Sequence, residues 1–228
     1  MGNVNLSKTT VNLSKSEKDN LSKSASDGLD KITIGLGWDE AQVETKASSD
    51  NKKTGLIGRL FGAKTSTVIR KAKSMDLDAW VCLMQDGRVD RATKTKLCYY
   101  GNLNIGDYIK HSGDNLTGDG EGDDEQIVIN LDKIPDKYDG ILIGVTIFNA
   151  KAKQQSFKDI ENFFVRVVDN RDDFEICRYS DNVSEEYSDS TTFIVGKIYK
   201  ESGEWKFSAY GNGMKANNIQ DAAEKYRG

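Results

Sequence analysis

Proline, histidine and cysteine are scarce in this chain of 228 residues, which contains one proline, one histidine and three cysteines. The cysteines (Cys82, Cys98 and Cys177) are odd in number, lack C-x-x-C spacing and lie in apolar runs, so we expect buried free thiols in a reducing compartment. No apolar run is long enough to cross a bilayer, and the first thirty residues lack the apolar core of a signal peptide. We therefore expect a cytoplasmic protein without a transmembrane segment.

Carboxylates, in contrast, are concentrated in one segment. Residues 114–125 hold six carboxylates, three glycines and no lysine or arginine. Such a density of like charge repels itself unless a cation cancels the field. Ca2+ takes six to eight oxygen ligands, and glycines let a short backbone wrap around it. The segment therefore predicts a calcium loop, although no register fits the EF-hand pattern. The alternative is a solvated acidic turn without metal.

The rest of the chain reads as short apolar runs separated by turn signals, a pattern typical of an antiparallel sandwich. We predict an all-β fold, an antiparallel β-sandwich of about ten strands, as a single domain over residues 1–228. Asn217–Tyr226 predicts a short C-terminal helix with Asn217 or Asn218 as its N-cap. Two N-terminal copies of an N-L-S-K repeat, 5–8 and 12–15, are also expected to form strands, while a third at 20–23 is left open. The other expected strands are 31–36, 78–84, 97–100, 126–131, 140–148, 163–168, 175–179, 192–199 and 204–210.

Several motifs in this order resemble the TerD family of tellurium-resistance proteins. They are the segments 34–39, 75–79, 98–103, 111–125, 145–150, 164–168 and 203–207. The resemblance implies a calcium-binding β-sandwich without established enzymatic activity that is associated with resistance to tellurite and other stresses. It also implies partners among other stress-resistance proteins of the same family or in a membrane-associated complex.

The chain departs from the family pattern in two places. An insertion at 41–74, rich in Lys, Ser and Thr, replaces a short loop, and we expect it to be flexible. Two alternatives are open for this insertion: it could be a docking peptide for an acidic partner or anionic membrane surface, or it could be a hairpin extension. The family's Ile-His-Asp-Ala reads Ile147-Phe148-Asn149-Ala150 here, which weakens any metal role at Asn149.

Asp76 and Asp78 are two residues apart on a predicted strand, so both side chains should point to one face. The family resemblance implies that this face lies close to the acidic loop. The number of candidate side chains exceeds one calcium shell, so we predict two Ca2+ ions. Side-chain ligands are expected from Asp76, Asp78, Asp114, Asn115, Asp119, Glu121, Asp123, Asp124 and Glu125, and backbone carbonyls from Leu116 or Gly118 and from Gly120.

The net charge of −4 is unevenly spread, because residues 44–73 carry +6 and leave −10 for the remainder. Direct binding of nucleic acid is therefore not expected. The predicted function is a calcium-binding, non-enzymatic stress-response module of the tellurium-resistance type, whose metal-ordered loop presents a surface to partners. The alternatives are a calcium-dependent phosphoester hydrolase, with His111 as general base, or a calcium-bridged binder of anionic ligands or lipids.

Overall fold

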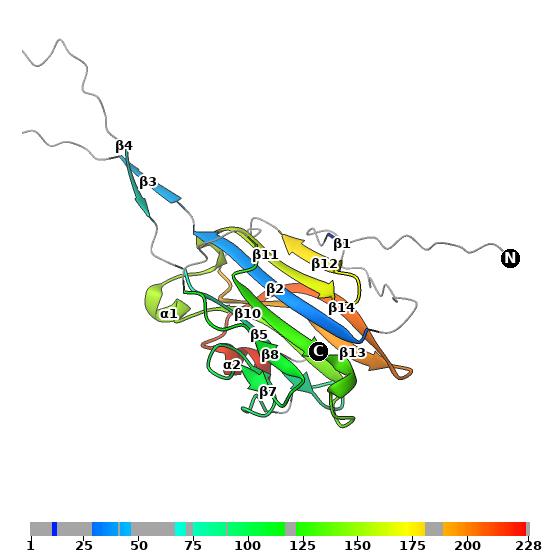
Figure 1. The fold of residues 1–228 in the computed structure, drawn as a ribbon. Helices are drawn as coiled ribbons and strands as arrows, with labels where there is room; N and C mark the ends of the chain where they lie inside the picture. The colour runs from blue at the N-terminus through cyan, green and yellow to red at the C-terminus, as the bar shows by residue number, and fades with distance from the viewer. Residues whose placement is uncertain are drawn as a thin grey trace, which may run out of the picture.

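Two β-sheets form the body of the molecule (Figure 1), as seen in a computed structural model that describes residues 11–12, 29–40, 42–46, 67–71, 75–89, 91–116, 122–180 and 189–226. Sheet 1 has the order β1 (Val11–Asn12), β12 (Phe174–Ser180), β11 (Ile160–Asp169), β2 (Lys31–Glu40), β9 (Glu125–Asn130), β8 (Ile109–His111), β7 (Asn104–Ile105). Sheet 2 has the order β14 (Glu204–Met214), β13 (Thr192–Glu201), β10 (Gly140–Ile147), β5 (Leu77–Met84), β6 (Leu97–Cys98). Neighbouring strands are antiparallel except β1 and β12. The predicted antiparallel sandwich is confirmed.

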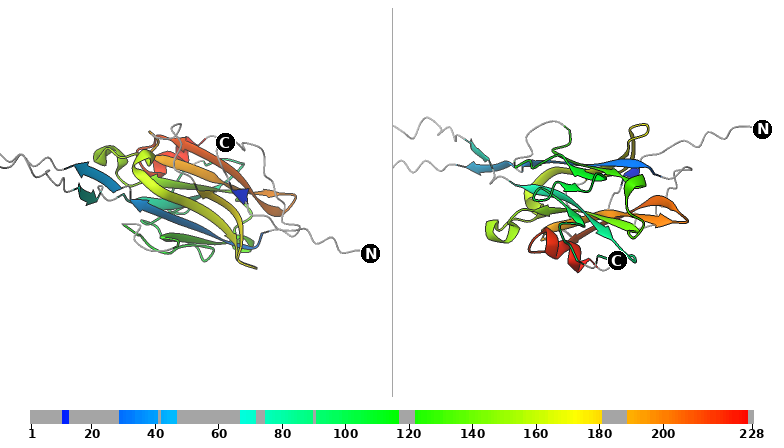
Figure 2. Two further views of the ribbon diagram at one scale, coloured as in Figure 1. Left: turned by 90° about the horizontal axis from the view of Figure 1, so that it is seen from above. Right: turned by 60° about the horizontal axis from the view of Figure 1, so that its bottom comes forward.

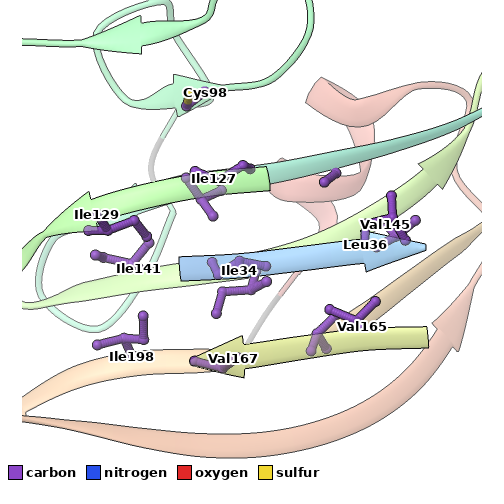
Figure 3. Close-up of a cluster of buried hydrophobic side chains, with 14 of the residues drawn as sticks. Ile34, Leu36, Cys98, Ile127, Ile129, Ile141, Val145, Val165, Val167 and Ile198 are labelled. Atoms are coloured by element: carbon purple, nitrogen blue, oxygen red, sulfur yellow. The ribbon is translucent and has the colours of Figure 1, made fainter. Parts of the chain in front are cut away.

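The main core lies between the two sheets. Ile32, Ile34 and Leu36 alternate along β2 and are at most 1% exposed, whereas Thr33 between them is half-buried. Figure 3 shows Ile34 and Leu36 among buried side chains from both sheets, including Ile141 of β10. This period of two is what the sequence pattern predicted for a strand with one buried face.

Sheet 2 is buried on both faces, because a second cluster covers its outer side. All eight residues of β5 are buried, and Trp80, Cys82 and Met84 pack with α2 (Ile219–Lys225) and with the connection after β5. Figure 2 shows α2 on the outside of sheet 2. A Cβ on Gly144 would lie 2.2 Å from the Trp80 ring, so the indole rests directly on β10 only because that residue is glycine.

The structure confirms the predicted helix, shortens one predicted strand and adds several short elements. The predicted C-terminal helix is present, and the Asn218 side chain caps it by accepting a hydrogen bond from Asp221 N. The strand expected over 97–100 ends at Cys98, because Tyr99 and Asn102 close a tight turn with reciprocal backbone hydrogen bonds. Unexpected short elements are β7, β8, the helix α1 (Ala150–Lys153) and the 3-10 turn η1 (Leu131–Lys133), and the structure also has the 3-10 turn η2 (Phe157–Asp159).

Within the insertion, β3 (Gln42–Lys46) and β4 (Thr67–Lys71) pair with each other in antiparallel register, as the hairpin alternative predicted. Residues 47–66 lie outside the described residues, as do the first N-L-S-K copy, the third, and most of the second. In the described part of the chain, no helix has both the length and the apolarity required to cross a membrane.

Candidate metal centre

Asp76 and Asp78 lie where the outer face of sheet 2 begins. Asp78 pairs across β5 and β10 with Thr146, one step along the same face from Trp80. The exposed fractions are 2% for Asp78 and 8% for Asp76. Carboxylates therefore occupy the end of a row that is otherwise apolar, and burying them needs compensation.

Asp114 approaches this pair from the segment that follows β8. One carboxylate oxygen each from Asp76, Asp78 and Asp114 lies within 4.8 Å of the other two. The structure thus brings together the strand pair and the first residue of the acidic segment, as the prediction required. We call these three residues the aspartate triad. Three hard oxygen donors at this spacing suit a divalent cation such as Ca2+.

Burial and mutual repulsion disfavour the charged form of the triad. Burial, together with the neighbouring carboxylates of Asp76, Glu125 and Asp114, raises the pKa of Asp78 to about 9. Burial also raises the pKa of Asp76, although the ammonium of Lys153 opposes this effect. In the absence of a cation, a proton is therefore favoured at Asp78 at neutral pH.

One oxygen of the triad has no local compensation. Asp76 Oδ1 is buried and has no hydrogen-bond partner among the described residues. The other oxygen, Oδ2, lies 3.8 Å from Lys153 Nζ on α1, a distance too long for a hydrogen bond. An unpartnered buried carboxylate oxygen beside two further carboxylates is the donor arrangement expected of a cation site. The residues present therefore fit the predicted ion.

Glu125 and His111 have structural partners at the edge of β5. Glu125 is fully buried, and its Oε2 accepts a hydrogen bond from Ala79 N at 2.8 Å. His111 Nδ1 accepts from Gly113 N at 3.1 Å, which leaves the proton on Nε2, 3.3 Å from Ala79 O. The side chains of Glu125 and His111, both from sheet 1, thus bind the backbone N–H and C=O of Ala79 as a neighbouring strand would. This geometry gives His111 the role of a group that bridges the two sheets and not that of a free general base.

Asp124 and Asn115 join the two ends of the acidic segment. Asp124 Oδ2 accepts from Trp38 N at 3.0 Å, and Oδ1 accepts from Asn115 Nδ2 at 3.1 Å. Asn115 N in turn donates to Glu125 Oε1 at 3.3 Å. Burial raises the pKa of Asp124, and the Trp38 hydrogen bond opposes this shift. These contacts hold the flanks of the segment against sheet 1.

Asp123 forms a two-point ion pair with Arg166 on β11. The oxygens Oδ1 and Oδ2 accept from Arg166 Nε at 2.7 Å and Nη2 at 2.9 Å, and Gln126 also donates to Oδ2. A Cβ on Gly35 would lie 2.4 Å from this carboxylate, so a glycine is needed in β2 for Asp123 to lie flat on the sheet. As placed, both Asp123 oxygens are engaged within the protein.

The remaining predicted ligands are distributed as follows. Leu116 is described, and the residue is 59% exposed. Gly118, Asp119, Gly120 and Glu121 lie outside the described residues, so their ligation stays a prediction. So does a metal role for Asn115, Asp123, Asp124 and Glu125.

Two basic residues near the site were missed by sequence reasoning. Arg166 sits in an alternating strand, where an outward-facing arginine is ordinary, and nothing in its neighbours signals a partner 43 residues away. Lys153 lies in a lysine-rich stretch that resembles any solvated helix. Lys153 and Arg166 are recognised only in the structure, where α1 lies close to Asp76 and β11 lies close to Asp123.

Comparison with known proteins agrees with this fold. The profile of the TerD domain matches residues 9–226. Stress response protein SCP2 of Bacillus subtilis (strain 168) is 35% identical over 217 residues, which cover 95% of this chain and 98% of the relative. Tellurium resistance protein TerD of Serratia marcescens is 33% identical over 218 residues, covering 95% and 97%.

A solved structure supports the fold independently. The crystal structure of a homologue of the telluride resistance protein TerD from Streptomyces coelicolor A3(2) superposes with a TM-score of 0.60 at 18% identity. The match covers 86% of this chain and 97% of that one. The domain match and the two relatives show that the chain belongs to the TerD-domain family, in which similar proteins are named for tellurium resistance and the stress response.

Proposed function

We propose that the protein is a calcium-binding module without enzymatic activity, acting in the stress response of the tellurium-resistance type. The aspartate triad would hold one Ca2+, and a second ion would bind within the acidic segment. The observation that supports this most is the buried Asp76 oxygen without a partner, directly beside the carboxylates of Asp78 and Asp114. Calcium would supply the positive charge that the triad lacks.

The ion would also order the acidic segment. Asp114 belongs both to the triad and to that segment, so its ligation would tie the segment to β5. The exposed apolar side chain of Leu116 would then be held in one position, as a docking residue requires. Partners of this surface are proposed among other stress-resistance proteins of the family or in a membrane-associated complex.

Calorimetric titration of the metal-stripped protein with CaCl2 tests the site. Asp114→Asn should weaken the tightest calcium site at least tenfold, because the amide keeps the shape but loses the charge. Asp107→Asn is the matched control, since Asp107 is also exposed and pairs with Lys133 away from the triad. Asp123→Asn distinguishes the triad from the wider ligand set, and an affinity within threefold of wild type is expected. Absence of saturable binding by the wild type would overturn the proposal.

The hydrolase alternative is tested on the same samples. A non-enzymatic module should release no p-nitrophenol from bis(p-nitrophenyl) phosphate or p-nitrophenyl phosphate, with or without calcium. Both ring nitrogens of His111 have partners in the protein, so no free base faces the triad through this residue. Calcium-dependent turnover that disappears in His111→Ala would contradict the proposal.

A further inference from the structure

A cavity of about 510 Å³ lies beside the aspartate triad, on the outer side of sheet 2. This volume is within the range of small-molecule sites in proteins. Its floor is the start of β5 and the end of β10, and its walls come from the connection after β5 and the residues leading into α2. Among its lining residues are Asp78, Lys94, Tyr99, Tyr100, Phe148 and Asn149.

Asp78 is shared by the cavity and the triad. One of its oxygens lies within 4.8 Å of the Asp76 and Asp114 oxygens, and the same residue lines the cavity. An ion held by three carboxylates would still have empty coordination positions, because Ca2+ takes six to eight oxygens. Because Asp78 belongs to both, the cavity adjoins the place that such an ion would occupy.

Three aromatic rings form one wall of the cavity. The Tyr99 and Tyr100 ring centroids are 5.0 Å apart at 82°, and those of Tyr100 and Phe148 are 5.7 Å apart at 88°. All three rings are half-buried, so each keeps surface available for contact. Edge-to-face packing fixes their orientation, and a fixed aromatic wall suits a planar or apolar group.

Polar residues also line the cavity. Lys94 and Asn149 are exposed and bring an ammonium and an amide to its lining. These groups donate hydrogen bonds and so favour an anion over a cation. The cavity therefore combines a place for a bound cation, an apolar wall and donors for negative charge.

We propose that this cavity binds a small organic oxyanion, a phosphate monoester or carboxylate with a planar apolar body. Its charged oxygens complete the coordination of the ion at Asp78, and its body packs on Tyr99 and Tyr100. The inference rests on the proposed calcium site and adds a ligand to it. Calcium then acts as the bridge between the protein carboxylates and the ligand.

Phenyl phosphate is a suitable probe, because it carries one phosphate and one planar ring. Calorimetry at saturating calcium should detect its binding, and the same titration in EDTA should show none. Inorganic phosphate, which lacks the ring, should bind about tenfold more weakly. Benzoate tests whether a carboxylate serves as well as a phosphate.

Tyr99→Ala tests the aromatic wall without touching the triad. It should weaken phenyl phosphate about tenfold and leave the calcium titration unchanged. Tyr108→Ala is the matched control, because both tyrosines are half-buried and each lies over a glycine, Gly101 for Tyr99 and Gly106 for Tyr108. The control should bind phenyl phosphate like the wild type.

The outcomes separate this inference from the calcium proposal. Normal calcium binding without phenyl phosphate or benzoate binding would overturn the cavity inference and leave the calcium site standing. Ligand binding that is equal in EDTA, or that calcium suppresses, would also overturn it, as would an unchanged affinity in Tyr99→Ala. Failure of the wild type to bind calcium would overturn the proposed function and the bridging mode together.

Discussion

Replacing Asp78 with asparagine removes the charge of the most buried member of the triad and keeps its shape. In the metal-free protein, Asp78 has a pKa raised from 3.8 to about 9 by burial and by its acidic neighbours. Keeping a proton on this group at pH 7 costs on the order of 4 kcal/mol relative to the unfolded chain, since each pH unit above 3.8 contributes about 1.4 kcal/mol. A buried amide costs about 1–3 kcal/mol when its hydrogen bonds are incomplete.

Asp78→Asn should therefore stabilise the metal-free protein by about 1–3 kcal/mol, which raises its melting temperature by roughly 2–12 °C. The same substitution should remove the stabilisation that the triad ion gives the wild type, about 2.7 kcal/mol at a hundredfold excess over its Kd. Thermal melts in EDTA and in CaCl2 measure both effects. A variant that melts lower than wild type in EDTA yet keeps the calcium-induced rise would refute this reasoning.

The remaining predictions concern pH and three other residues. Between pH 3.8 and about 9, folded Asp78 keeps a proton that the unfolded chain has released, so stability of the metal-free protein falls as pH rises through this window, and calcium binding at pH 7 should release about one proton. Lys153→Gln should tighten calcium binding about three- to tenfold, because the ammonium 3.8 Å from Asp76 competes with the ion. Gly35→Ala should destabilise the fold by about 1–3 kcal/mol, since the new methyl group displaces the Asp123 carboxylate. His111→Ala should cost about 1–3 kcal/mol of stability by unpairing the edge of β5.

Each of these has a direct measurement. Calorimetry in two buffers of different ionisation enthalpy counts the released protons, and a count of zero would contradict the pH argument. Lys151→Gln, on the same short helix but exposed, is the control for Lys153→Gln and should leave calcium affinity unchanged. Urea unfolding reports the other two variants. The Gly35→Ala penalty should shrink in an Asp123→Ala background, and a full penalty there would show that the clash lies elsewhere.

The fold could be predicted from the sequence wherever a strand has one buried face. The period of two along β2 and the apolar run of β10 predicted the sandwich, and Asn218 predicted the start of α2. The short elements β7 and β8 were missed, because two or three residues give no periodic signal. The second core under α2 was missed because both faces of β5 are buried, which hides the alternation that separates inner from outer residues.

The candidate site was predictable in part. Spacing placed Asp76 and Asp78 on one face, and family resemblance implied their closeness to Asp114, which the structure shows. The sequence could not reveal which acids have protein partners. The pairing of Asp123 with Arg166, and of Glu125 with Ala79 N, depends on contacts between sheet strands far apart in the chain. Such contacts cannot be inferred from the local amino-acid composition.

A crystal grown in CaCl2, with anomalous diffraction recorded, tests the metal centre most directly. We expect an anomalous peak within about 2.3–2.6 Å of one oxygen from each of Asp76, Asp78 and Asp114. A well-ordered crystal with only water among these three carboxylates, at a calcium concentration that saturates the protein in solution, would contradict it.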